Sequence, residues 1–155
     1  MPKEEFMREA ISMATTNVAN GGGPFGAIVV KDGKVIGRGV NRVTADNDPT
    51  AHAEVNAIRD AARNEGTFDL SGSVIYTSCE PCPMCLGAIY WAHISKIFYG
   101  NTKADAARIN FDDSFIYKQL SLPEPDRFIP QEQMLPNEAI ETFKAWDAKT
   151  DKTEY

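Results

Sequence analysis

Pro81–Cys85 reads PCPMC, and His52–Glu54, roughly 30 residues earlier, reads HAE. One histidine and two cysteines give a zinc ion three protein ligands and leave its fourth position open for water, which is typical of catalytic zinc sites. Glu54 follows the histidine by two positions, where its carboxylate can carry protons to and from that water. We therefore predict one catalytic zinc ion per chain, with the ligands His52, Cys82 and Cys85.

A purely structural zinc site is the alternative, and its ligands would be Cys79, Cys82, Cys85 and His93. A pair of cysteines at this spacing also occurs in redox motifs. His93 follows Cys85 by eight residues, which is a rise of about 12 Å on a continuous helix, so these two side chains would not share one ion. We interpret His93 as a helix-end residue, Cys79 as a small buried thiol and Glu80 as a loop or cap carboxylate.

The composition of the 155 residues fits one soluble globular domain over 1–155. The net charge of −6 disfavours a large nucleic-acid surface, which depends on clustered Lys and Arg. The first residues lack the basic and apolar pattern of an export signal, and no apolar run reaches the ~18 residues of a membrane span. Three closely spaced cysteines make a poor disulfide framework, so we expect reduced thiols and a cytoplasmic location.

Hydrophobic periodicity predicts an alternation of strands and helices. The expected strands are 26–31, 35–41, 73–77 and 96–99, with a hairpin turn at Asp32 and Gly33. Helices are expected over 3–19, after a turn at 78–83, over 103–108, over 114–120 and over 138–148, and residues 121–130 are expected to be extended. This pattern predicts an α/β fold in which helices cover both faces of a mixed sheet.

A further helix carries His52 and Glu54 near its start. We expect a polar loop over 44–49 before it, and Asp48 or Thr50 as its cap, with Pro49 in the first turn. Positions i and i+2 of a helix point about 200° apart, so His52 and Glu54 share a site only at the helix tip.

Several longer segments carry a family resemblance: Gly22–Ala27 (GGPFGA), Asn47–Glu54 (NDPTAHAE), Tyr76–Ala92, Phe111–Tyr117 (FDDSFIY) and the terminal pair Glu154–Tyr155. The chain resembles the cytidine-deaminase superfamily and, within it, the small zinc-dependent guanine deaminases of bacteria. The resemblance covers nearly the whole chain and is weakest around residues 122–140. The zinc motif assigns only the superfamily, whereas the FDDxF segment and the terminal tyrosine carry the guanine assignment.

The resemblance implies a three-layer α/β/α sandwich with a five-stranded mixed sheet, and the hydrolysis of guanine to xanthine and ammonia. It implies a homodimer that exchanges its C-terminal segment, about 136–155, and a small purine as the substrate, with no nucleic acid or membrane partner. The site residues that it implies are Asn41 as a hydrogen-bond partner of the purine, Phe25 as a stacking ring, the Ala53 backbone N–H as a contact, Asp113 as a second proton carrier, Trp91 in the pocket wall and Tyr155 as a lid from the partner chain.

The residues themselves leave alternatives open at some of these positions. Asn41 alone also suits a strand-end turn, Asp112 and Asp113 are not distinguished by their chemistry, and a terminal tyrosine is often a frayed end. Three other functions compete with guanine deamination: guanosine deamination of the plant type, adenosine deamination on transfer RNA, and a non-catalytic zinc-binding module.

Overall fold

The computed structural model describes residues 3–155 and divides into two compact units, of which the first ends at Ser114 and the second is Phe115–Tyr155. The expectation of a single domain over 1–155 stays a prediction. The expectation about an export signal rests partly on residues 1 and 2, which lie outside the described residues.

The first unit is built on a mixed four-stranded sheet. Its strands are β1 (Gly26–Lys31), β2 (Lys34–Val40), β3 (Ser73–Cys79) and β4 (Lys96–Asn101), in the order β2-β1-β3-β4. Strand β1 pairs antiparallel with both β2 and β3, and β3 pairs parallel with β4. Asp32 and Gly33 both have positive φ, at 50° and 76°, which is the backbone of a two-residue hairpin turn.

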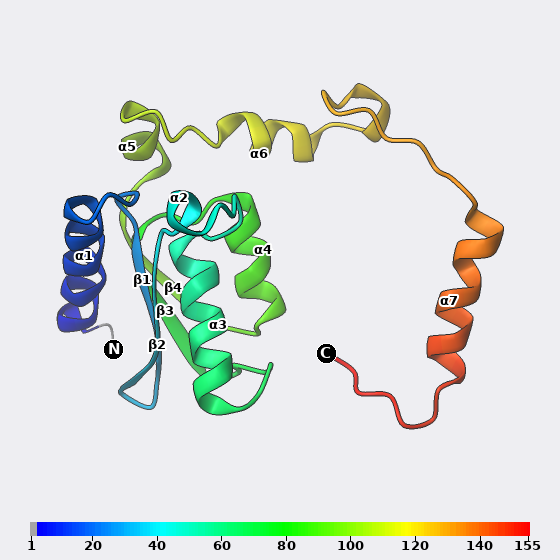
Figure 1. Cartoon of the computed structure of the whole chain (residues 1–155), viewed down its shortest axis with the longest axis horizontal. Helices are drawn as coiled ribbons and strands as arrows, with labels where there is room; N and C mark the ends of the chain where they lie inside the picture. Colours follow the sequence, from blue (N-terminus) through cyan, green and yellow to red (C-terminus); the bar gives the residue numbers. More distant parts are fainter. Residues whose placement is uncertain (1–2) are drawn as a thin grey trace. The chain divides into compact units, whose positions relative to one another are not determined.

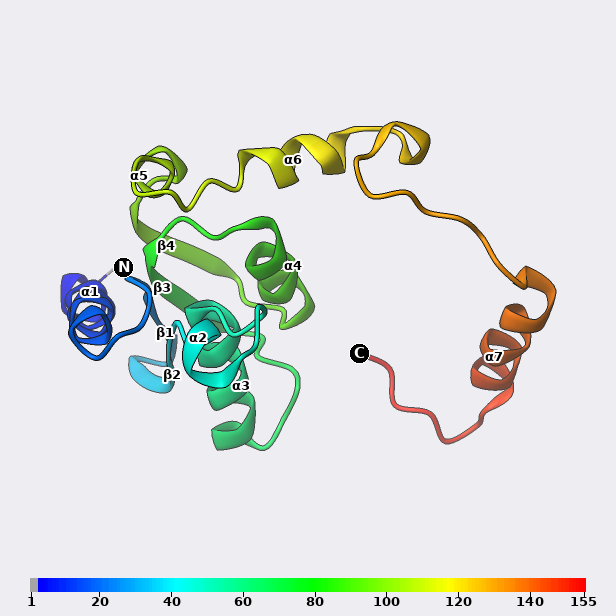
Figure 2. The same cartoon turned by 45° about the horizontal axis from the view of Figure 1, so that its top comes forward.

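Helices cover both faces of this sheet, as Figures 1 and 2 show. Helix α1 (Glu4–Ala19) lies on one face, and α3 (Ala53–Glu65) and α4 (Pro83–Trp91) lie on the other. Strand residues alternate between two hydrophobic cores. One contains Phe6, Ile28, Val30 and Tyr76, and the other contains Ala27, Val29, Ile75 and the buried alanines of α3. The predicted α/β fold with helices on both faces is therefore confirmed.

Helix α3 packs very closely against β2. The alanines Ala53, Ala57 and Ala61 form a fully buried stripe at every fourth position of the helix. Opposite them, a Cβ atom at Gly39 would overlap the carbonyl oxygen of Ala53, and one at Gly37 would overlap that of Ala57. Small residues on both elements thus fix the N-terminal end of α3 beside the end of β2.

The prediction of a five-stranded sheet is wrong, since the sheet of the described residues has four strands. At the β2 edge, polar side chains of α3 occupy the backbone groups that another strand would bind. Asn56 donates to the Val40 carbonyl, Asp60 accepts from the Arg38 N–H, and Asn64 donates to the Ile36 carbonyl. At the β4 edge, a capping box of Thr102 and Asp105 starts helix α5 (Lys103–Arg108) soon after the strand ends.

Two local predictions before α3 are also wrong. The predicted loop at 44–49 contains a short helix, α2 (Val43–Asp46), on which Asp46 pairs with Arg42. Neither Asp48 nor Thr50 caps α3, because its N-cap is His52. The Asp48 carboxylate instead accepts hydrogen bonds from the backbone N–H and the hydroxyl of Thr50, which closes a turn before the helix.

The second unit continues helix α6 (Ser114–Ser121) and contains a 3-10 helix, η1 (Glu124–Asp126), and helix α7 (Pro136–Ala148). The predicted helices at 114–120 and 138–148 are confirmed, and η1 interrupts the segment predicted to be extended. Apolar side chains of α7 are exposed within this unit, notably Ile140, Phe143 and Trp146. None of the helices within residues 3–155 combines the length and hydropathy that a membrane crossing needs.

Candidate functional site

The three predicted metal ligands meet at the N-terminal ends of two helices. His52 is the N-cap of α3, Cys82 is the N-cap of α4, and Cys85 lies in the first turn of α4. The Nδ1 atom of His52 lies 3.5 Å from the Sγ atom of each cysteine, and the three ligand atoms lie within 4.8 Å of one another. Tetrahedral zinc with ordinary Zn–S and Zn–N bonds needs a sulfur–nitrogen separation of about 3.6 Å. The donor set therefore fits zinc in both chemistry and spacing.

The four-ligand structural alternative is not formed. His93 follows the C-terminal end of α4 and is exposed, whereas the cysteines lie at the N-terminal end. The Sγ atom of Cys79 lies 3.9 Å from the Thr102 carbonyl oxygen, and its side chain is buried. Burial, with the nearby Glu54 carboxylate, raises the pKa of Cys79 to about 11, so this thiol stays protonated. Glu80 accepts a hydrogen bond from the Lys103 N–H at the start of α5, as expected for a cap carboxylate.

The two cysteine ligands have opposite acidities in the metal-free chain. The Cys85 thiol donates to Cys82 and, together with His52, lowers the pKa of Cys82 to about 4. That same hydrogen bond, together with burial, raises the pKa of Cys85 far above its ordinary value. The hydrogen bond to Cys82 also raises the pKa of His52. One thiolate is therefore already formed, and a cation that binds here displaces the proton that the pair retains.

Glu54 lies at the second position of α3, next to the ligand cluster. Its side chain is buried, with 6% exposed, and burial raises the pKa of its carboxyl group. The carboxyl interacts with the Cys85 thiol and with the charge of His52. Because both residues lie at the tip of α3, Glu54 and His52 share a site as the sequence required. A buried carboxyl group with a raised pKa suits a proton carrier.

The structure distinguishes the two adjacent aspartates. The Asp112 carboxylate is fully exposed and accepts a hydrogen bond of 2.9 Å from the Ser114 N–H at the start of α6. Asp113 is half-buried, and desolvation, followed by the charge of Cys82, raises the pKa of its carboxyl group. Asp113 also raises the pKa of Cys79. The charge of Asp113 therefore acts on Cys79 and Cys82, whereas Asp112 closes a turn before α6.

Asn41 and Phe25 lie side by side at the ends of paired strands. The Asn41 N–H donates to the Phe25 carbonyl at 3.2 Å, and the Phe25 ring meets the Phe111 ring edge-on at a centroid distance of 5.0 Å. The Asn41 Oδ1 atom accepts from the Val43 N–H at 3.2 Å, which is the turn role considered from sequence. The Asn41 amide retains two Nδ2 hydrogens and one further lone pair on Oδ1 for other partners.

The three remaining predicted site residues, Ala53, Trp91 and Tyr155, lie in different parts of the chain. Ala53 is fully buried at the first position of α3, where the backbone N–H has no partner within the helix. Trp91 ends α4, about 13 Å of helical rise from Cys82, and is 69% exposed. Tyr155 belongs to the second unit and is 78% exposed. The first unit does not bring Trp91 into the ligand cluster, so the roles of Trp91 and Tyr155 stay predictions.

The sequence model of a protein family, the cytidine and deoxycytidylate deaminase zinc-binding region, matches residues 1–101 of this chain. The chain belongs to this deaminase family. It is 51% identical to guanine deaminase of Bacillus subtilis (strain 168) over the whole length of both proteins. The X-ray structure of guanine deaminase from Bacillus subtilis superposes with a TM-score of 0.96 and covers 100% of this chain and 99% of that one.

Other members of the deaminase family match a smaller part of the chain. A tRNA-specific adenosine deaminase of Haemophilus influenzae is 38% identical over 72% of this chain and 68% of its own length. A guanine deaminase structure from Nitrosomonas europaea is 33% identical with a TM-score of 0.69, and covers 72% of this chain and 65% of that one. The match to the guanine deaminase of Bacillus subtilis thus covers the whole chain, whereas the matches to the tRNA-specific enzyme and to the Nitrosomonas europaea enzyme each cover 72% of it.

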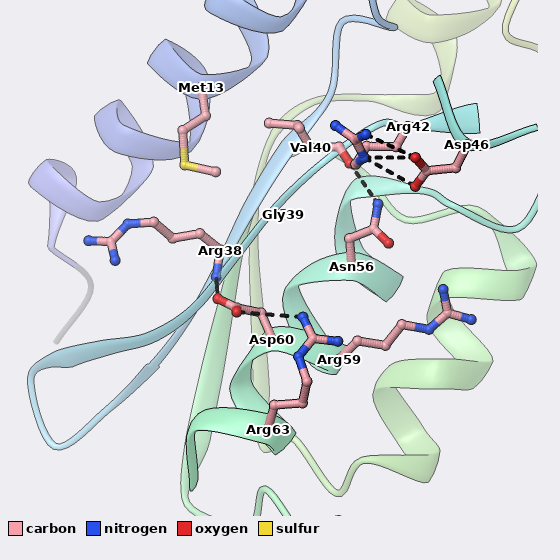
Figure 3. Close-up of a pocket in the computed structure, with 10 residues that line it drawn as sticks. All are labelled: Met13, Arg38, Gly39, Val40, Arg42, Asp46, Asn56, Arg59, Asp60 and Arg63. Carbon is pink, nitrogen blue, oxygen red and sulfur yellow. Dashed lines mark hydrogen bonds and ion pairs between the residues drawn. The ribbon is translucent and has the colours of Figure 1, made fainter. Parts of the chain in front are cut away.

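A cavity lies between β2, α2 and α3 (Figure 3), and none of the three metal-ligand residues lines it. It measures about 530 Å³, and its wall includes Arg38, Arg42, Arg59 and Arg63. Each arginine has a carboxylate partner, respectively Glu9, Asp46, Asp48 and Asp60. Because the charges balance, this groove attracts anions weakly, and we assign it no site.

Sequence reasoning missed two asparagines that hold the site's backbone. Asn56 donates from Nδ2 to the carbonyls of Val40, at 2.8 Å, and of Ala51, at 3.3 Å, which joins the segments that precede Asn41 and His52. Asn17 makes a similar bridge from α1. The sequence offers no signal for either residue, since each contact joins elements that are distant along the chain.

Proposed function

We propose that this chain is a zinc-dependent guanine deaminase that hydrolyses guanine to xanthine and ammonia. The observation that carries the proposal is the cluster of His52, Cys82 and Cys85 with the buried carboxyl group of Glu54 beside it. The cluster supports hydrolytic deamination, and the full-length similarity to a guanine deaminase supports guanine as the substrate.

The residues divide the proton transfers between them. When bound by the three ligands, zinc supplies Lewis-acid chemistry that makes water an effective nucleophile near neutral pH. Glu54 takes one proton from the water as the water oxygen bonds to the ring carbon that carries the amino group, and passes this proton to the adjacent ring nitrogen. Asp113 and Glu54 then move the second proton of the water, from the new hydroxyl group, to the amine. The carbon–nitrogen bond breaks, ammonia leaves and a carbonyl forms. The raised pKa values of Glu54 and Asp113 favour this exchange, because a proton carrier works best near the operating pH.

The base is held by groups around the ends of β1, β2 and α3. Asn41 donates from Nδ2 to an acceptor atom on the edge of guanine, and the Ala53 N–H supplies a second donor. Phe25 offers its ring to the face of the purine. Trp91 lines the pocket wall, and Tyr155 closes the pocket from a second copy of the chain.

The second copy exchanges its C-terminal segment, about 136–155, in a homodimer. The exposed apolar side chains of α7 support this arrangement, because such a face is normally covered by protein. A cytoplasmic location fits the chemistry, since all three cysteines are free and zinc binding requires reduced thiols.

The test is ammonia release from zinc-loaded protein that is offered guanine, guanosine, adenine, cytosine and cytidine in parallel. We expect release from guanine alone. Release from guanosine would show a pocket that is open on the ribose side and would contradict the Tyr155 lid. If zinc-loaded protein released ammonia from none of the five compounds, this would contradict guanine deamination and favour a polynucleotide substrate or a non-catalytic module.

A further inference from the structure

The side chain of Asn17 bridges two backbone segments that carry the base-binding groups. From the last turns of α1, its Nδ2 atom donates to the Gly23 carbonyl at 2.8 Å and to the Asn41 carbonyl at 2.9 Å. Two further hydrogen bonds close the arrangement: the Phe25 N–H donates to Gly23, and the Asn41 N–H donates to Phe25. One half-buried amide therefore fixes both the loop before β1 and the end of β2.

The packing around the Asn17 amide leaves no room for a side chain at Gly22 or Gly23. A Cβ atom at Gly22 would overlap the amide nitrogen of Asn17, and one at Gly23 would lie 3.0 Å from the Cγ atom of Asn41. Neither glycine has a positive φ, so the conformation of the backbone does not require glycine at either position. The glycines are needed because they let the loop approach both asparagine side chains.

An asparagine suits this position better than related side chains. Its Nδ2 atom carries two hydrogens, one for each carbonyl, at a short reach from the helix. Aspartate would place a carboxylate against two carbonyl oxygens, and alanine would leave both carbonyls without this donor. The Asn17 side chain makes no contact with the metal ligands in its hydrogen bonds, so its influence runs through Asn41 and Phe25.

We propose that Asn17 is a positioning residue for base recognition, which sets the place of Asn41 and Phe25 against the purine and acts on the substrate only through them. The proposal rests on the function proposed above. Because small displacements of binding groups weaken recognition strongly, loss of the bridge reduces affinity for the base rather than proton transfer. Zinc binding stays intact.

Steady-state kinetics with guanine test the proposal. Removal of two hydrogen bonds in Asn17→Ala raises the KM by about tenfold with a smaller change in kcat. The matched control is Asn64→Ala, which removes a hydrogen bond of 2.8 Å to the Ile36 carbonyl on the same strand β2 and leaves both constants unchanged. Zinc content, measured by plasma mass spectrometry, stays at one ion per chain in both variants. A fall in kcat with an unchanged KM would overturn the proposal.

A double-mutant cycle separates positioning from general stability. Because Asn17 acts partly through Asn41, Asn17→Ala raises the KM less in an Asn41→Ala background than in the wild type, and the remaining effect runs through Phe25. A full effect of Asn17→Ala in a background that lacks both the Asn41 side chain and the Phe25 ring would overturn the proposal. Should Asn17→Ala fold poorly, Gly22→Ala disturbs the same amide from the other side, because its methyl group would overlap the Asn17 side chain. A folded, zinc-loaded Gly22→Ala variant with an unchanged KM would likewise overturn it.

Hydrogen exchange supplies a readout that needs no substrate. We expect the backbone N–H groups of Phe25 and Asn41 to exchange faster in Asn17→Ala than in Asn64→Ala. If the wild-type protein does not turn over guanine, the proposed function fails, and this measurement still decides whether Asn17 holds the two segments. Equal exchange rates in the two variants would overturn the positioning role.

Discussion

The Nδ1 atom of His52 lies 3.5 Å from the Sγ atom of Cys82, although the residues are 30 positions apart. Each is the N-cap of its helix, so the N-terminal ends of α3 and α4 converge on one point. Helix N-termini carry partial positive charge from their aligned peptide dipoles. The fold thus favours negative sulfur at this point and prepares the cluster for a cation.

In the metal-free protein, the two thiols Cys82 and Cys79 should differ in how their alkylation rates depend on pH. The pKa of Cys82 is about 4 and that of Cys79 is about 11. Because alkylation follows the thiolate, Cys82 should react with iodoacetamide at a nearly constant rate above about pH 6, whereas Cys79 should react only in strong alkali. Mass spectrometry of the modified peptides measures both rates. A Cys82 rate that rises tenfold per pH unit from pH 7 to 9 would show an ordinary thiol, and zinc should protect Cys82.

Glu54→Gln tests the role of the buried carboxyl group. Glutamine keeps the shape of the side chain and cannot exchange a proton, so kcat for guanine should fall by about 10²- to 10⁴-fold. The fold and the zinc content should be retained, because Glu54 is not one of the three clustered ligands. Circular dichroism and plasma mass spectrometry supply these controls. Turnover near the wild-type rate would remove Glu54 from the mechanism.

Asp113→Asn and Asp112→Asn form a matched pair. The charge of Cys82 acts on Asp113, whereas Asp112 accepts from the Ser114 N–H, so we expect only the first change to reach the chemistry. We expect Asp113→Asn to lower kcat by about 10²-fold. Asp112→Asn should have no effect on kcat, since an asparagine side-chain oxygen accepts the same turn hydrogen bond. The reverse order of effects would show that the wrong aspartate has been assigned.

Deletion of Tyr155 tests the lid. The side chain is 78% exposed, so its loss should leave the melting temperature nearly unchanged. We expect kcat/KM for guanine to fall by at least about tenfold, because a closing side chain excludes water from the site. The control Glu154→Ala keeps the terminal tyrosine and should behave like the wild type. Identical kinetics for the deletion and the wild type would refute the lid.

The metal ligands could be predicted from the sequence because each lies within a short motif at a helix start. Strands β1 to β4 follow from runs of apolar and β-branched residues, and these predictions agree with the structure to within two residues at most ends. The number of strands in the sheet was not predicted correctly, since five were expected and the described residues form four. The edge of β2 is satisfied by the side chains of Asn56, Asp60 and Asn64, and such contacts between a helix and a strand leave no periodic pattern in the sequence.

The residues that hold the site in place could not be predicted from the sequence either. Asp112 and Asp113 have the same chemistry, and only their surroundings in the fold separate a carboxylate that closes an exposed turn from a half-buried one on which the charge of Cys82 acts. Asn17 is one of several polar residues on the amphipathic helix α1, and its role depends on carbonyls that the fold brings to it. Motifs identified the groups that react, whereas tertiary contacts determine the groups that hold them.

The most direct test of the account is the conversion of guanine to xanthine by zinc-loaded protein, followed by chromatography with ammonia measured in the same samples. We predict one xanthine and one ammonia for each guanine consumed, no product from guanosine, and loss of activity when a chelator removes the zinc. Protein that holds one zinc ion per chain and yet forms no xanthine would contradict the central claim.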